Sequence, residues 1–228
     1  MRLKMKTRIV LALAVSYILS GSVACVSMSS LQTAETLEKG KTQSTFGGGY
    51  YSSEETVNNA TIKTNLPYLE YSYREGIAKD LDGGVKLTII GSATADLKYR
   101  LIDGDAFDLS VGGGAGYMTL TSGSGATEVK NTIIDFMVPA YASYRFDPSW
   151  AVYATPRYVL RMNSRSGADS GTSTASLLGG AGGVKIGKSW GTYLEAAYQK
   201  QLGSNFDLMQ YNVSFFWEAD GGFLSQFF

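Results

Sequence analysis

Histidine is absent from the 228 residues of this chain, and cysteine occurs once, as Cys25. Without histidine the chain can form neither a Ser-His or Asp-His hydrolase pair nor a zinc site with a histidine ligand. A single cysteine excludes disulfide bonds within the chain. No other catalytic constellation stands out in the sequence. We therefore expect a protein that is not an enzyme and that needs neither a metal ion nor an organic cofactor.

Charged residues are also scarce. They make up 18% of the chain, against about 25% in ordinary soluble domains, and the formal net charge is +0. A chain without excess positive charge gives no reason to expect a nucleic-acid partner. The mean hydropathy of −0.04 is nevertheless too polar for a bundle of membrane helices. Low charge with moderate hydropathy is typical of a membrane β-barrel, in which only alternate residues face lipid.

The clearest structural pattern lies in residues 92–121 and predicts a β-hairpin with two unlike faces. Apolar or small side chains alternate with polar ones on both sides of the turn at 103–105. The apolar and small face carries Ala93, Ala95, Leu97, Tyr99, Leu101, Phe107, Leu109, Val111, Gly113, Ala115 and Tyr117. A period of two is a strand pattern. Each arm has about ten residues, close to what a tilted strand needs to cross a bilayer.

The same alternation recurs along most of the chain and predicts an all-β fold. We expect an antiparallel up-and-down transmembrane β-barrel of about ten strands, within a range of roughly eight to twelve. The expected strands are residues 44–53, 67–74, 83–90, 92–102, 107–121, 132–146, 150–162, 175–186, 190–200 and 207–217. Residues 44–217 then form the barrel, and residues 218–228 form a carboxy-terminal tail.

The links between these strands are long at one end of the expected barrel and short at the other. Three long links alternate with three short ones, namely 53–65, 122–131 and 163–174 against 103–106, 147–149 and 187–189. Bacterial membrane barrels have short periplasmic turns and longer extracellular loops. An even number of strands then places both termini on the periplasmic side.

This pattern resembles the small up-and-down barrels of the Gram-negative outer membrane. The resemblance covers residues 44–217, and the terminal Phe228 is similar to the aromatic residue that such proteins present to the barrel insertion machinery. It implies an outer-membrane location, with outer-membrane lipid and the insertion machinery as partners. A surface partner is not indicated by any motif.

The first 24 residues predict export. A basic start, the apolar run 9–19 and a few small residues make the pattern of a secretory signal peptide. Residues 22–25, Ser-Val-Ala-Cys, resemble the lipobox of bacterial lipoproteins, although Ser22 stands where that family usually has leucine. The resemblance implies acyl chains such as palmitate on Cys25 and delivery by the lipoprotein sorting machinery. Residues 22–24 also fit ordinary signal cleavage. The polar residues 25–43 predict a periplasmic tether, which a short helix would fit.

The polar face of the predicted strands carries an ionic cluster. Its members are Glu70, Arg74, Lys86, Asp96, Lys98, Arg100, Asp108, Asp135, Arg145, Arg157, Arg161, Lys185 and Glu195. These charges should point into the lumen, because each would cost about 2–4 kcal/mol on the lipid face at the bilayer midplane. Two outcomes fit, an ion-paired plug or a narrow pore. Because bases outnumber acids in the cluster, a pore should prefer anions.

Two local features need a structural interpretation. Residues 182–189 match the phosphate-binding loop pattern, but strand alternation continues through them, and no helix is expected after them. The glycines on the polar face, such as Gly112 and Gly183, should leave room for long side chains from the opposite wall. Pro139 and Pro156 interrupt two strands, and we expect them to face each other across one local bulge.

The sequence therefore predicts a bacterial outer-membrane barrel lipoprotein. It would act either as a structural or surface-exposed protein or as a narrow pore. The alternative is a soluble periplasmic β-barrel lipoprotein that binds an apolar ligand. In that protein the two faces would exchange places, with the apolar side chains inside and the charges in water.

Overall fold

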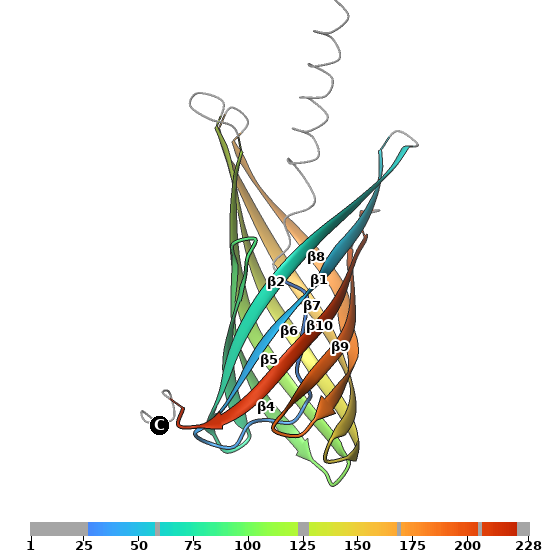
Figure 1. The fold of residues 1–228 in the computed structure, drawn as a ribbon. Helices are drawn as coiled ribbons and strands as arrows, with labels where there is room; N and C mark the ends of the chain where they lie inside the picture. Colours follow the sequence, from blue (N-terminus) through green and yellow to red (C-terminus); the bar gives the residue numbers. More distant parts are fainter. Residues whose placement is uncertain (1–26, 58–59, 123–127, 168–169, 205–206, 223–228) are drawn as a thin grey trace, which may run out of the picture.

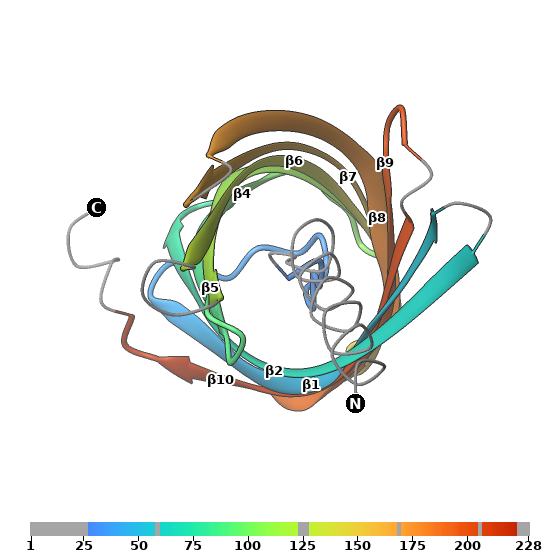
Figure 2. The ribbon, with the colours of Figure 1, turned by 90° about the horizontal axis from the view of Figure 1, so that it is seen from above.

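The fold is a closed antiparallel β-barrel, seen here in a computed structural model (Figures 1 and 2). The structure describes residues 27–57, 60–122, 128–167, 170–204 and 207–222. The strands are β1 (Lys41–Val57), β2 (Ala60–Ala78), β3 (Leu81–Thr88), β4 (Ser92–Asp103), β5 (Phe107–Ser122), β6 (Val129–Asp147), β7 (Trp150–Ser166), β8 (Gly171–Gly187), β9 (Trp190–Gln201) and β10 (Asp207–Asp220). The predicted signal peptide, Cys25 and Phe228 lie outside the described residues.

The up-and-down topology confirms the predicted fold class. Each strand pairs with its neighbours in the chain, and β1 pairs with β10 to close the sheet. The closing ladder runs from Lys41 opposite Asp220 to Glu54 opposite Asp207. Closure leaves no unpaired sheet edge, which is the condition for a sheet to cross a bilayer.

Most strands are longer than predicted, whereas β3 is shifted and ends at Thr88, two residues before the predicted end. The polar stretches predicted as long links are mostly strand, because a ladder of backbone hydrogen bonds does not require apolar side chains. The β1–β2, β5–β6 and β7–β8 hairpins accordingly extend well beyond the β3–β4 hairpin (Figure 1). At the other end β1 begins at Lys41 rather than residue 44, and β10 continues past Trp217 to Asp220.

The two faces of the sheet are as unlike as the sequence predicts. On β4, Leu97 faces outward and is 52% exposed, whereas the adjacent Lys98 faces the lumen and is 1% exposed. Val138 and Val213 are likewise 64% and 60% exposed on the outer face. The apolar side chains therefore surround the barrel, and the charged ones lie inside.

The segment before β1 lies inside the barrel, which corrects the predicted tether outside it. Residues 27–36 are almost all buried, and Figure 2 shows this segment, in blue, within the ring of strands. It reaches the short-turn end at Lys39, which bridges Gly76, and then enters β1. It forms no helix. No helix long and apolar enough to span a membrane occurs in the described part of the chain.

Two local predictions about the wall are wrong in detail. Pro139 pairs with Arg157, not with Pro156, and pairing is interrupted beyond it without a change of register, so no shared bulge forms. The luminal glycines accommodate side chains of adjacent strands rather than of the opposite wall. A Cβ on Gly183 would lie 2.6 Å from the hydroxyl of Tyr153 on the neighbouring β7.

Candidate functional site

The candidate site is the contact between the barrel wall and the luminal segment, defined as residues 27–39. Glu195 on β9 is the main acceptor of its upper part. Both carboxylate oxygens of Glu195 accept the backbone N–H of Ser30 at 3.0 Å, and Oε2 also accepts the N–H of Leu31 at 2.8 Å. The same carboxylate accepts Tyr153 Oη at 2.9 Å and Asn212 Nδ2 at 2.8 Å. Leu31 has a φ of 47°, so consecutive N–H groups converge on one anion as in a backbone nest.

A second carboxylate, Glu70 on β2, binds the segment through hydroxyl groups. Its Oε2 accepts Ser27 Oγ at 2.6 Å and Ser29 Oγ at 2.8 Å. Lys86 on β3 binds the same stretch of chain, because its Nζ donates to the carbonyl of Ser29 at 2.5 Å and to the Oγ of Ser29 at 2.8 Å. An acid and a base of the wall thus hold one short stretch of the segment together.

Met28 is held on both sides of its peptide unit. Its N–H donates to Oε1 of Gln210 at 2.8 Å, and its carbonyl accepts Nη2 of Arg157. Its side chain packs in an apolar luminal layer with Tyr51, Tyr68, Ala181, Ala197 and Leu208. Polar contacts and an apolar layer therefore fix the same residue.

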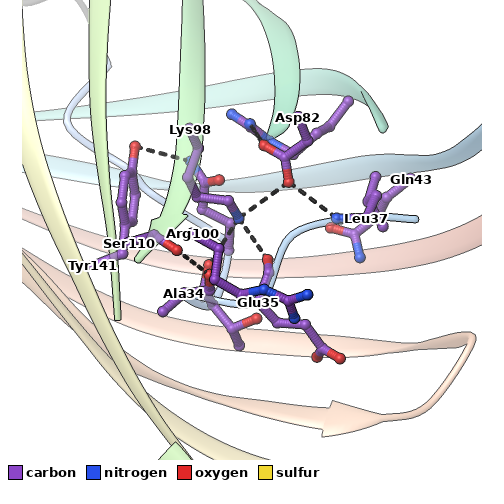
Figure 3. Close-up of polar contacts among 12 residues, drawn as sticks. Ala34, Glu35, Leu37, Gln43, Asp82, Lys98, Arg100, Ser110 and Tyr141 are labelled. Carbon is purple, nitrogen blue, oxygen red and sulfur yellow. Dashed lines mark hydrogen bonds and ion pairs between the residues drawn. The ribbon is translucent and has the colours of Figure 1, made fainter. Parts of the chain in front are cut away.

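The lower part of the segment is held by Lys98 of β4 (Figure 3). Lys98 Nζ donates to the carbonyls of Thr33 at 2.9 Å and Glu35 at 2.7 Å, and it lies 3.4 Å from Oδ2 of Asp82. The same Oδ2 accepts the N–H of Leu37 at 3.2 Å. A buried ion pair thus presents its cation to carbonyls and its anion to an amide.

Between these contacts Ala34 is completely buried. Its N–H donates to Oγ of Ser143 on β6 at 3.2 Å, and its carbonyl accepts Oγ of Ser110 on β5. A bulky side chain such as that of tryptophan would displace the wall, because interiors are close-packed.

Arg74 of β2 links the two wall carboxylates next to Lys98. Its guanidinium bonds both Asp82 on β3 and Asp96 on β4. With Lys98 beside Asp82, two bases and two acids alternate around the wall. Such a network keeps each buried charge next to an opposite one, as burial requires.

The predicted ionic cluster divides into several separate groups. Glu70, Lys86, Lys98, Arg157 and Glu195 contact the luminal segment directly, and Arg74 and Asp96 lie behind it. Arg145 also contacts the segment, through Glu35 at 3.1 Å, and lies 3.3 Å from Asp108 of the wall. The remaining members form ion pairs along the wall: Arg161 with Asp135 at 2.7 Å, Arg100 with Asp80 at 2.7 Å and Lys185 with Glu218 at 3.8 Å. None of the thirteen side chains is exposed.

Sequence reasoning missed two components of this site. Asp82 is completely buried, and alternation with Gly84 and Lys86 would have placed it in the lumen had the third strand been started one residue earlier. The luminal segment shows no alternation, and it is bound largely through its backbone. Its high content of serine and threonine is the only signal that could have indicated it, and that signal equally fits a linker.

Little space remains around the upper part of the segment. A cavity of about 40 Å³ lies beside it and is lined in part by Arg74, Lys86 and Arg157, which is room for a few water molecules. A vestibule of about 830 Å³ opens below, at the short-turn end. Its lining mixes acids such as Glu38 with bases such as Lys188.

Comparison with known proteins relates the chain to outer-membrane barrels by fold alone. No protein-family model matches the sequence, and no curated protein matches it. The outer membrane protease OmpT from Escherichia coli has 10% identity and a TM-score of 0.50, over 82% of this chain and 100% of that one.

Two further solved structures have lower TM-scores. The translocator domain of the autotransporter NalP from Neisseria meningitidis has 11% identity and a TM-score of 0.47, over 77% of this chain and 88% of that one. Ail, the attachment invasion locus protein of Yersinia pestis, has 12% identity and a TM-score of 0.42, over 80% and 100%.

Proposed function

We propose that this chain is a bacterial outer-membrane β-barrel whose lumen is closed by its own luminal segment. In this proposal it is a structural or surface-exposed protein that does not conduct as an open pore. The observation that carries the proposal is the burial of residues 27–36 within the barrel, bonded to the wall through backbone and side chains. The short turns face the periplasm, and the long hairpins face outward.

The apolar outer face supports a membrane location over the soluble alternative. A soluble barrel would have Leu97 and Val213 inside and Lys98 in water, but the burial of these residues is the reverse. Exposed apolar patches above a few hundred Å² are rare on soluble monomers, and here apolar side chains face outward on strands all around the barrel. Lipid is the solvent that suits such a surface.

We propose a main role other than catalysis. The likeness to a protease is a likeness of fold at 10% identity and brings no residue roles with it. The buried charges of the lumen are engaged with one another or with the segment, which is an arrangement for binding and stability. Export by the signal peptide and acylation of Cys25 remain predictions from the sequence.

Planar-bilayer recording of the purified protein tests the closure. The intact protein should show little steady conductance, whereas a variant lacking residues 27–39 should form a stable pore because the lumen then holds water. The sequence predicts anion preference, but Asp80, Asp82 and Glu218 bring the wall acids to eight, equal to the eight bases of the predicted cluster, so that pore should show little charge preference. As a matched control, Glu38→Ser with Lys39→Ser changes only the exposed end of the segment and should stay closed. Equal unit conductance of intact and deleted proteins would contradict the proposal.

A further inference from the structure

The wall recognises the luminal segment mainly through atoms that every polypeptide has. Wall side chains accept from the backbone N–H groups of Met28, Ser30, Leu31, Ala34 and Leu37. Wall side chains donate to the backbone carbonyls of Met28, Ser29, Thr33, Ala34 and Glu35. Acceptors and donors of the wall are thus interleaved at the spacing of a peptide chain.

The side chains of the segment add a size limit and two apolar anchors. Ser27, Ser29, Thr33 and Ala34 are small and buried. Met28 packs in the upper apolar layer, as described above. Three residues later, Leu31 packs in a separate pocket formed by Tyr153, Tyr193 and Phe216. Small residues on both sides of and between two apolar anchors therefore define what this lumen admits.

This arrangement is more than closure requires. A lumen can be filled by wall side chains that pair with one another, as Arg161 and Asp135 do here. Instead, Glu195 accepts amide groups of the segment, and Lys98 donates to two of its carbonyls while it also lies 3.4 Å from Asp82. Charged hydrogen bonds to a backbone are among the stronger polar contacts in proteins.

We propose that the lumen is a polypeptide-binding site, which will accept a separate peptide of this kind once its own segment is withdrawn. The ligand class is a non-helical chain of small residues with apolar side chains three positions apart. The inference rests on the proposed closure of the lumen by residues 27–39. Conductance of the uncut protein tests that closure independently.

The test starts from the full chain, folded with its segment in place. A protease recognition sequence inserted after Glu38, whose side chain is 81% exposed, allows the segment to be cut from the finished barrel. The cut barrel is washed in detergent and titrated with a fluorescent peptide of residues 27–38, followed by anisotropy. We expect saturable binding that unlabelled peptide displaces, or retention of the cut segment through size-exclusion chromatography. Either result shows binding without a covalent link.

Specificity is tested in the same titration with one altered peptide and two altered barrels. The peptide with Ala34→Trp should not bind, because Ala34 is fully enclosed. Lys98→Met in the barrel should weaken binding about ten- to hundredfold, through the loss of charged hydrogen bonds to two carbonyls. Lys200→Met, on the exposed outward face of β9, is the matched control and should leave binding unchanged.

Three results would overturn the proposal. The first is a folded, emptied barrel that shows no saturable peptide binding. The second is equal binding of the Ala34→Trp peptide. The third is loss of the barrel fold as soon as the segment is cut, since a site that exists only when covalently filled cannot take a separate ligand. Heat-dependent gel mobility reports the fold in each case.

Discussion

At the scale of single residues, the lumen depends on buried charges that share partners. Arg74 is the clearest case, because its guanidinium lies between Asp82 and Asp96 and its side chain is 10% exposed. The adjacent Gly84 leaves it room, since a Cβ there would lie 2.9 Å from Nη2. Removal of one member of such a group leaves the others as uncompensated charges in a poorly solvated place.

Arg74→Met should therefore lower the free energy of unfolding by about 3–5 kcal/mol, as is found when one partner of a buried ion pair is removed. Urea titration of the barrel in lipid vesicles measures this difference. Lys41→Met is the control, because Lys41 forms a solvent-exposed pair with Glu38 at 3.5 Å and should cost less than about 1 kcal/mol. A similar small cost for both variants would show that the network around Arg74 is not buried in the membrane-embedded protein.

The sequence was sufficient to assign these charges to one face but not to pair them. A period of two places Lys98 and Arg157 on the side opposite Leu97 and Val152, and the burial of these residues follows it. Partner choice depends on register and on side-chain reach, so the pairing of Asp82 with Arg74 and Lys98 and the acceptors on the luminal segment could not be predicted. The segment itself binds through its backbone, which leaves almost no trace in the identity of its residues.

At the scale of elements, each strand is defined by its outward face. Leu97 lies halfway along the outward side of β4. One end of this hairpin is marked by Tyr117 of β5, which pairs with Ala93, and the other end by Phe107, which follows the short turn. These two aromatic residues are 49% and 44% exposed and suit the two membrane interfaces. Leu97 should accordingly lie near the bilayer midplane.

Leu97→Arg should lower the free energy of unfolding in lipid vesicles by about 2–4 kcal/mol, because an arginine at the midplane of the lipid face is poorly solvated. Leu101→Arg is the matched control on the same face of the same strand, next to the short-turn end, where the cost should fall to about 0–1 kcal/mol. Equal costs at both positions, measured by the same urea titration, would be incompatible with lipid around the middle of β4.

Strand boundaries were the part of the elements that the sequence could not predict. The number of strands and their order follow from alternation and turn residues. The hairpin ends do not, since β1 continues to Val57 and β2 begins at Ala60 through residues that are mostly polar. Outside the lipid layer both faces of a hairpin meet water, so the alternation disappears while the backbone pairing continues.

At the scale of the whole molecule, one chain supplies both the barrel and its filling. A ten-stranded barrel has a wider interior than an eight-stranded barrel, whose interior wall side chains can fill by themselves. Here the additional space is occupied by the luminal segment, which passes down the barrel and continues directly into β1 at the short-turn end. The sequence left plug and pore open, and it did not predict that residues 27–36 would lie in the lumen.

The most direct test of this account is a disulfide between the luminal segment and the wall. With Cys25→Ser the chain has no cysteine, so Ala34→Cys and Ser143→Cys form a single pair, at positions where N of Ala34 and Oγ of Ser143 are 3.2 Å apart. In the folded barrel in membranes, mild oxidation should link them rapidly and change the mobility of the unreduced protein. The pair Ala34→Cys and Leu97→Cys, with Leu97 on the outer face, should not link. If the first pair does not form a disulfide and its two thiols react with a membrane-impermeant reagent, the segment does not occupy the lumen.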